Sequence, residues 1–159
     1  MQNETGDFLL DRSKIGYHLP TLKYRVELGQ LRFFSKTVGE TNPIYFDEEA
    51  AQSAGYRSII APPTFAFSCV RGAADQLPLV TALDLSDDEI GRSLHGEQRF
   101  QFGEPICAGD CISINEKIID IYEKKKKTGT LQFAVSESQL RNQLNEFVAG
   151  MTMVLIIKN

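Results

Sequence analysis

The sequence predicts an α+β domain in which one antiparallel sheet curls around a single buried helix. Residues 64–77 are apolar nearly all the way round a helix, which is typical of a helix that packs on every side. About four long segments of alternating apolar residues follow, between residues 94 and 157, and turns that suit antiparallel neighbours separate them. Because a strand at residues 22–26 and another helix come first, we expect one sheet with its helices on one face.

Helix boundaries are clear in the first half of the chain. An amphipathic helix at residues 31–38 can end at Gly39, because glycine accepts the left-handed conformation found at helix C-termini. Asp47 is placed to cap a short helix at residues 48–54, and Thr64 is placed to cap the buried helix.

Residues 78–91 are acidic and rich in turn-forming residues, so we expect a loop there. In the strand that follows, simple alternation puts His95 on the same face as Glu97 and Arg99, opposite Phe100. A surface hydrogen-bonding cluster is therefore the favoured interpretation of His95.

The last strands carry three further signals. A phase slip after Ile118 predicts a β-bulge. The four lysines at 124–127 predict a hairpin tip, and residues 141–146 predict another turn. Residues 147–157 are apolar on both faces, which is typical of a central strand.

Composition excludes several functional classes. The 159 residues, 42% of them apolar, suit one domain over residues 1–159 with a sizeable core. No apolar run reaches the roughly 20 residues of a membrane-spanning helix, and residues 1–6 lack the start of a secretory signal, so we expect a cytoplasmic protein. The net charge of −4 argues against nucleic acid as the main partner.

Metal chemistry lacks ligands in this sequence. The chain has two histidines and three cysteines, and no second Cys or His pair follows Cys107 and Cys111 at ligand spacing. We therefore expect reduced cysteines, no metal and no cofactor.

Four short motifs, in order along the chain, resemble those of the MaoC-like (R)-specific enoyl-thioester hydratases. Residues 38–45 (VGETNPIY) resemble the hydration loop of that family, and residues 50–65 resemble the segment that leads into its central helix. Residues 95–110 and 141–149 resemble its next strand and its last hairpin. The resemblance covers roughly residues 20–157 and is greatest to the N-terminal, fungal-fatty-acid-synthase-like dehydratase subgroup. It implies a hot-dog fold, an antiparallel sheet wrapped around a long central helix.

Hydration of an enoyl thioester requires a base to activate water and an acid to protonate the α-carbon. It also requires a donor for the thioester oxygen, where negative charge develops. The resemblance implies that an aspartate and a histidine of the hydration loop supply the acid and the base. It also implies that a backbone N–H at the start of the central helix, usually from a glycine, binds the oxygen.

This sequence departs from the family pattern at each of those positions. Glu40 stands in place of the aspartate, Tyr45 in place of the histidine and Pro63 in place of the glycine. Glutamate keeps a carboxylate but moves it by one methylene, and tyrosine, with an ordinary pKa of about 10, is a poor base at neutral pH. Proline has no N–H to donate. We therefore predict that Glu40 and Tyr45 are degenerate catalytic positions.

The resemblance implies a division of labour, because hot-dog domains pair and the acyl chain lies at their interface. The chain is similar to the non-catalytic subunit of heterodimeric hydroxyacyl-thioester dehydratases. We predict a subunit that binds an acyl-CoA or acyl carrier protein thioester, in a homodimer or in a heterodimer with a catalytic MaoC-like partner. The predicted substrate-binding residues are Asn42, Pro43, Pro62, Pro63, Thr64 and Phe65.

Three alternatives stay open at this stage. A self-sufficient homodimeric hydratase would use Glu40 with another acid. A hot-dog thioesterase would need a carboxylate or hydroxyl near the central helix, where Thr64 is the nearby candidate, although helix capping explains Thr64 more simply. A binding module would hold acyl thioesters without turnover. The lysines at 124–127 most simply form a solvated tip, and their functional alternative is attraction to coenzyme A phosphates or an acidic carrier protein.

Overall fold

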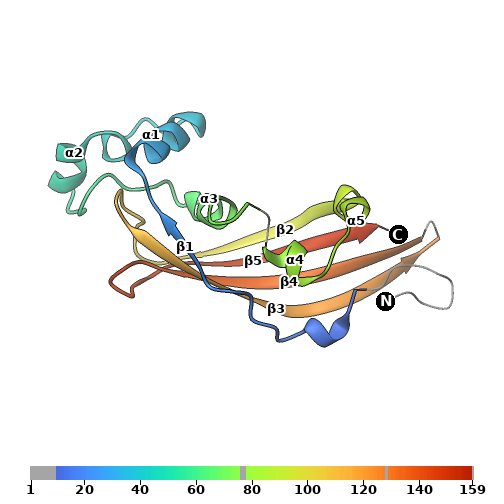
Figure 1. Ribbon diagram of the computed structural model, residues 1–159. Helices are drawn as coiled ribbons and strands as arrows, with labels where there is room; N and C mark the ends of the chain where they lie inside the picture. The colour runs from blue at the N-terminus through green and yellow to red at the C-terminus, as the bar shows by residue number, and fades with distance from the viewer. Residues whose placement is uncertain (1–9, 76–77, 128, 159) are drawn as a thin grey trace.

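One five-stranded antiparallel sheet forms the base of the protein (Figure 1). The computed structural model describes residues 10–75, 78–127 and 129–158. The order of strands across the sheet is β1-β3-β4-β5-β2. The strands are β1 (Leu22–Arg25), β2 (Ser93–Phe102), β3 (Cys111–Lys126), β4 (Gly129–Arg141) and β5 (Phe147–Lys158).

The helices lie on one side of this sheet, which confirms the expected α+β hot-dog architecture (Figure 1). At one end lie α1 (Leu28–Thr37) and α2 (Glu48–Ser53), and α3 (Phe65–Gly72) covers the neighbouring part of the sheet. Toward the other end lie α4 (Pro78–Ala82) and α5 (Asp87–Gly91). Two 3-10 turns complete the set, η1 (Arg12–Lys14) and η2 (Pro43–Tyr45). None of the helices in the described ranges is long and apolar enough to cross a membrane.

Several features expected of the strands are confirmed. β5 lies inside the sheet, between β4 and β2. The register between β3 and β4 shifts between Ile118 and Asp120, which is the expected bulge. β3 and β4 form the expected hairpin.

The expected cap of α2 is also confirmed, because the Asp47 side chain accepts a hydrogen bond from the Ala50 N–H at 2.7 Å.

The buried helix is shorter than the expected range of residues 64–77. α3 ends at Gly72, where the ring of Tyr24 packs so closely that a Cβ would lie 2.6 Å from the ring atom Cε2. Leu77 lies outside the described residues. The helix still packs against the sheet through four buried residues, namely Phe65, Ala66, Cys69 and Val70.

Two prolines form the turn on which α3 begins. The Phe65 N–H donates to the Pro62 carbonyl at 2.9 Å, and the Ala66 N–H donates to the Pro63 carbonyl at 3.4 Å. Thr64 makes no side-chain capping hydrogen bond, so the expectation that it caps the helix is wrong. Backbone bonds to the two proline carbonyls satisfy the first amides of the helix instead.

The expectation of a loop over residues 78–91 is also wrong, because α4 and α5 occupy most of it. α5 begins with a capping box, in which the Ser86 N–H donates to the Glu89 carboxylate at 2.7 Å and the Glu89 N–H donates to the Ser86 hydroxyl at 3.4 Å. Serine followed three residues later by glutamate is the sequence signature of this motif, and it was present in the chain.

A bulge in β2 overturns the expected placement of His95. The register against β5 shifts between His95 and Glu97, so the extra residue, Gly96, moves His95 to the other face. There its ring lies 5.4 Å from the ring of Phe67 on α3, and its Nε2 lies 3.2 Å from the Gln98 side chain. Glu97 and Arg99 pair with each other on the outer face, at 2.7 Å.

Two hydrophobic clusters lie on the inner face of the sheet, and a polar row separates them. One cluster lies beneath α3 and the other beneath α4. Between them, Glu116 on β3 pairs with Ser138 on β4, and Ser136 lies two residues before Ser138 on the same face of β4. All three side chains are buried. Burial raises the pKa of Glu116, and the nearby Ser136 hydroxyl partly opposes the rise.

Asp110, in the turn before β3, is fully buried and accepts hydrogen bonds from three other positions. The two terminal guanidinium nitrogens of Arg57 donate to its two carboxylate oxygens at 3.0 and 3.3 Å. The Cys107 N–H donates at 2.8 Å and the Gln143 side-chain amide at 2.9 Å. The carboxylate thereby ties the segment before α3 and the β4–β5 hairpin to one turn.

We predict that Asp110→Ala lowers the free energy of unfolding by roughly 3 kcal/mol, because it leaves buried donors without acceptors. Urea denaturation of the variant measures this loss. The control is Asp88→Ala, which removes an ion pair whose carboxylate is 81% exposed and should cost less than about 1 kcal/mol. Equal losses in the two variants would contradict the role given to Asp110.

A second prediction concerns the pH dependence of stability. The pKa of Glu116 is higher in the folded than in the unfolded protein. Between these two pKa values the folded protein therefore binds more protons than the unfolded protein does, so the free energy of unfolding falls as pH rises through that interval. Glu116→Gln removes this fall, so the variant gains stability relative to the wild type as pH rises. Urea unfolding at several pH values measures the difference, and parallel curves for the two proteins would rule the prediction out.

Candidate functional site

The segment that resembles a hydration loop is fixed by local hydrogen bonds. Gly39 adopts a φ of 82° and ends α1, as expected. The Asn42 side chain accepts a hydrogen bond from the Ile44 N–H at 3.2 Å and so caps η2, whose first residue is Pro43. Asn42 and Pro43 thus shape the backbone that positions Tyr45 at the end of the turn.

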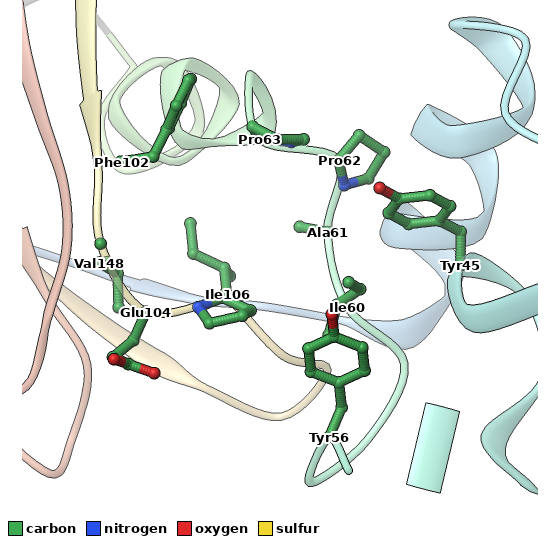
Figure 2. A pocket seen from close by; sticks show the side chains of 12 residues that line it. Tyr45, Tyr56, Ile60, Ala61, Pro62, Pro63, Phe102, Glu104, Ile106 and Val148 are labelled. Carbon is green, nitrogen blue, oxygen red and sulfur yellow. The ribbon is translucent and has the colours of Figure 1, made fainter. Parts of the chain in front are cut away.

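A pocket of about 240 Å³ opens beside this loop, where the strand-like segment before α3 lies antiparallel to the segment before β3 (Figure 2). The Ala61 N–H donates to the Ile106 carbonyl at 2.7 Å and holds the two segments together. The lining residues are Tyr45, Tyr56, Ile60, Ala61, Pro62, Pro63, Phe102, Gly103, Glu104, Pro105, Ile106 and Val148.

Apolar groups dominate the walls, and two phenols and one carboxylate add polarity. Figure 2 shows Tyr45 and Tyr56 on the side of Pro62, with Phe102 and Glu104 across the pocket. Ligand pockets of roughly 300–1,000 Å³ enclose whole small molecules. A pocket of about 240 Å³ therefore suits one part of a larger ligand.

The electrostatics of the pocket favour a neutral phenol at Tyr45. Burial raises the pKa of Tyr45, and the negative charge of Glu40 raises it further. A phenol that stays protonated can donate a hydrogen bond to a carbonyl oxygen, but it cannot accept a proton from water at neutral pH. Glu40 is half-buried behind Tyr45 and is not among the lining residues.

The structure brings some of the predicted site residues together and leaves others apart. Tyr45, Pro62 and Pro63 line the pocket. Phe65 lies in the core, where its ring meets that of Phe34 edge-on at 5.3 Å. The other predicted residues do not line the pocket, namely Glu40, Asn42, Pro43 and Thr64.

The predicted site residues omit nine of the twelve lining residues, among them Tyr56, Phe102 and Glu104. Tyr56 lies within residues 50–65, and Phe102 and Glu104 lie within residues 95–110, but none of the three carries a pattern of its own. Glu104 directly precedes Pro105, which belongs to the third motif, and that proximity was the available signal.

The lysines at 124–127 lie at the opposite end of the sheet from the pocket (Figure 1). β3 begins near the pocket at Cys111 and runs to Lys126, a distance of roughly 50 Å at 3.3 Å per residue. Charges in solution are screened over about 10 Å at 0.1 M salt. These lysines therefore cannot act on a ligand in the pocket of their own chain.

Two of the three cysteines, Cys69 and Cys107, are buried, and burial raises the pKa of both thiols. Cys69, Cys107 and Cys111 are free thiols, and burial raises the pKa of Cys69 to about 12. Among the residues that the structure describes, no three His, Cys, Asp or Glu side chains cluster as a metal site would require.

Residues 13–151 match the family described as FAS1-like, dehydratase domain region. The chain therefore belongs to the FAS1-like dehydratase family, and its structural neighbours are MaoC-like hot-dog proteins related to (R)-hydratases.

The chain is also similar to curated bacterial proteins. The chain is 39% identical over 113 residues to a UPF0336 protein of Streptomyces avermitilis, a match that covers 70% of the chain and 73% of the relative. A UPF0336 protein of Thermobifida fusca is 30% identical over 151 residues, with 94% of each chain covered.

Solved structures of the same fold include two complexes from Mycobacterium tuberculosis. A chain of the HadBC (3R)-hydroxyacyl-ACP dehydratase complex is 25% identical with a TM-score of 0.75, and the match covers 90% of this chain and 96% of that one. A chain of the ChsH1–ChsH2 complex is 20% identical with a TM-score of 0.69, covering 88% and 83%. An (R)-hydratase from A. caviae is 16% identical with a TM-score of 0.65, covering 89% and 94%.

We predict that Glu40→Gln lowers the pKa of Tyr45, by less than roughly one unit, because it removes a like charge beside the phenolate. Ring-carbon NMR of labelled tyrosine measures the titration. The matched control is Glu27→Gln, which removes the like charge beside Tyr24 and should shift the Tyr24 resonance instead. An unchanged Tyr45 titration in Glu40→Gln would contradict the arrangement described here.

Proposed function

We propose that this protein is the acyl-thioester-binding subunit of an (R)-specific enoyl-thioester hydratase, or 3-hydroxyacyl-thioester dehydratase, and that a partner subunit supplies the acid and the base. The main support is one observation. The loop keeps the turn that positions residue 45, but the pocket is bordered by Tyr45 and Pro63 in place of a histidine and an N–H donor.

The chain lacks each element of the chemistry that it would need alone. Tyr45 has a raised pKa and is a poor base. Pro63 has no N–H with which to bind the thioester oxygen as negative charge develops on it. Glu40 retains a carboxylate, but it does not line the pocket, and small displacements of a catalytic group cost large factors in rate.

Binding is the role that the pocket supports. The two prolines, Ile106 and Phe102 provide apolar walls for the part of an acyl thioester near its reacting carbons. The phenol of Tyr45 can donate a hydrogen bond to a carbonyl oxygen. The thioester would be carried by coenzyme A or by an acyl carrier protein.

Two features favour a partner. The pocket is small for a whole ligand, so a second subunit could complete it. β2 is a ten-residue edge strand, and a strand of this length presents unpaired backbone groups to another sheet. HadBC, a (3R)-hydroxyacyl-ACP dehydratase, and ChsH1–ChsH2 are each described as a complex. We propose a heterodimer with a catalytic MaoC-like subunit, while a homodimer can form when that partner is absent.

The proposal is tested by measuring hydration of crotonyl-CoA and longer enoyl-CoA substrates. The purified chain alone should show no hydration above the uncatalysed rate. Mixed with a MaoC-like protein that has the intact Asp and His loop, it should raise the rate on longer chains by about tenfold over that protein alone, equivalent to about 1.4 kcal/mol. The matched control is Glu40→Ala, which should leave the rate of the mixture unchanged.

The other outcomes point to different functions. Hydration by the lone chain that Glu40→Ala abolishes would mean a self-sufficient homodimeric hydratase. Release of free thiol from acyl-CoA, abolished in Thr64→Ala, would mean a thioesterase. Binding of acyl-CoA with no turnover in any mixture would mean a binding module.

A further inference from the structure

Glu116 and Ser138 of the polar row border a small, partly open space on the inner face of the sheet, which the proposed hydration chemistry does not use. Glu116 and Ser138 are directly paired across β3 and β4, and each is only 6% exposed. Gln98 on β2 reaches the same space from the other side. Phe67 and Val70 of α3 also line the space, from the helix side.

The dimensions of this space fit one oxygen atom. Its volume is about 10 Å³, which is close to the room that a single water needs. Buried waters typically have about three polar partners, and Glu116, Ser138 and Gln98 are three such partners. A methylene in the same place would offer no hydrogen bond to the carboxyl of Glu116 or the hydroxyl of Ser138, and is therefore less favourable there than a hydroxyl.

An apolar track along β2 links this space to the pocket. Phe102 lines the pocket and Gln98 borders the small space, and four residues of strand separate them by roughly 13 Å. Phe100 lies between them and stacks on Phe102 with ring centroids 5.5 Å apart. These β2 side chains are only partly covered, so an extended chain can lie along them without unpacking the core.

We infer that the space between Glu116, Ser138 and Gln98 recognises a hydroxyl group far along a medium-length acyl chain, and that Glu116 is a specificity-determining residue. The inference rests on the proposed function, because it assumes that the thioester end occupies the pocket. An acyl chain with a hydroxyl at the right distance can form hydrogen bonds with Glu116, Ser138 and Gln98. A plain chain of the same length places methylenes against these side chains.

The test is calorimetric titration of the full chain with three probes. Butyryl-CoA is too short to reach the polar row and reports on thioester binding alone. Decanoyl-CoA and 10-hydroxydecanoyl-CoA differ only in the terminal hydroxyl. We expect the wild type to bind the hydroxylated chain about tenfold more tightly than the plain one. Glu116→Gln, which keeps a donor and an acceptor, should retain the preference, and Glu116→Leu should lose it.

The matched control is Glu137→Gln on the exposed face of β4, which should behave as the wild type. Equal affinities of the wild type for the two ten-carbon probes would overturn the inference, whatever the variants do. A preference that persists in Glu116→Leu would overturn the role of Glu116. If butyryl-CoA binds but the hydroxyl has no effect, only the inference fails, whereas absence of binding to all three probes overturns the proposed function as well.

Discussion

The buried carboxylate of Asp110 connects segments that are distant in the chain, and the position of the pocket depends on it. Its partners come from the segment before α3, from its own turn and from the β4–β5 hairpin. The backbone carbonyl of Asp110 also accepts a hydrogen bond from the N–H of Val26, the residue after β1, at 2.8 Å. A buried charge is tolerated only with such a set of partners, and these partners hold the strand-like segment of Ala61 against that of Ile106.

The pocket is therefore a product of tertiary structure more than of any local motif. Its loop side is fixed by η2 and its helix side by two prolines, whose φ angles are restricted before folding begins. A site built from such segments needs little ordering when a ligand binds.

Much of the fold could be predicted from the sequence, because alternation and capping signals act locally. The bulge after Ile118 was visible since it interrupts a run of apolar residues. The bulge at Gly96 was not, because polar residues stand on both faces of the edge strand β2 and the alternation continues through Gly96 with no interrupted apolar run to mark the shift. The close contact between Gly72, at the end of α3, and Tyr24 of β1 joins two distant parts of the chain, and no helical pattern contains it.

The candidate site was predictable only in part, for the same reason. Tyr45, Pro62 and Pro63 stand in motifs that could be recognised one at a time. Glu104 and Tyr56 reach the pocket only because two remote segments pair through Ile60 and Cys107. Pairing between remote segments is a property of the whole sheet, so the sequence around either residue does not indicate it.

The division of the inner face into two hydrophobic clusters has a consequence for dynamics. α3 and the residues around the pocket pack on one cluster, while α4 and the start of the chain near Leu10 pack on the other. Local opening reactions follow such boundaries, because each cluster can lose its cover without exposing its neighbour. Amide hydrogens near α4 should therefore exchange through openings that leave the pocket intact, and one end of the molecule can fluctuate while the other keeps its shape.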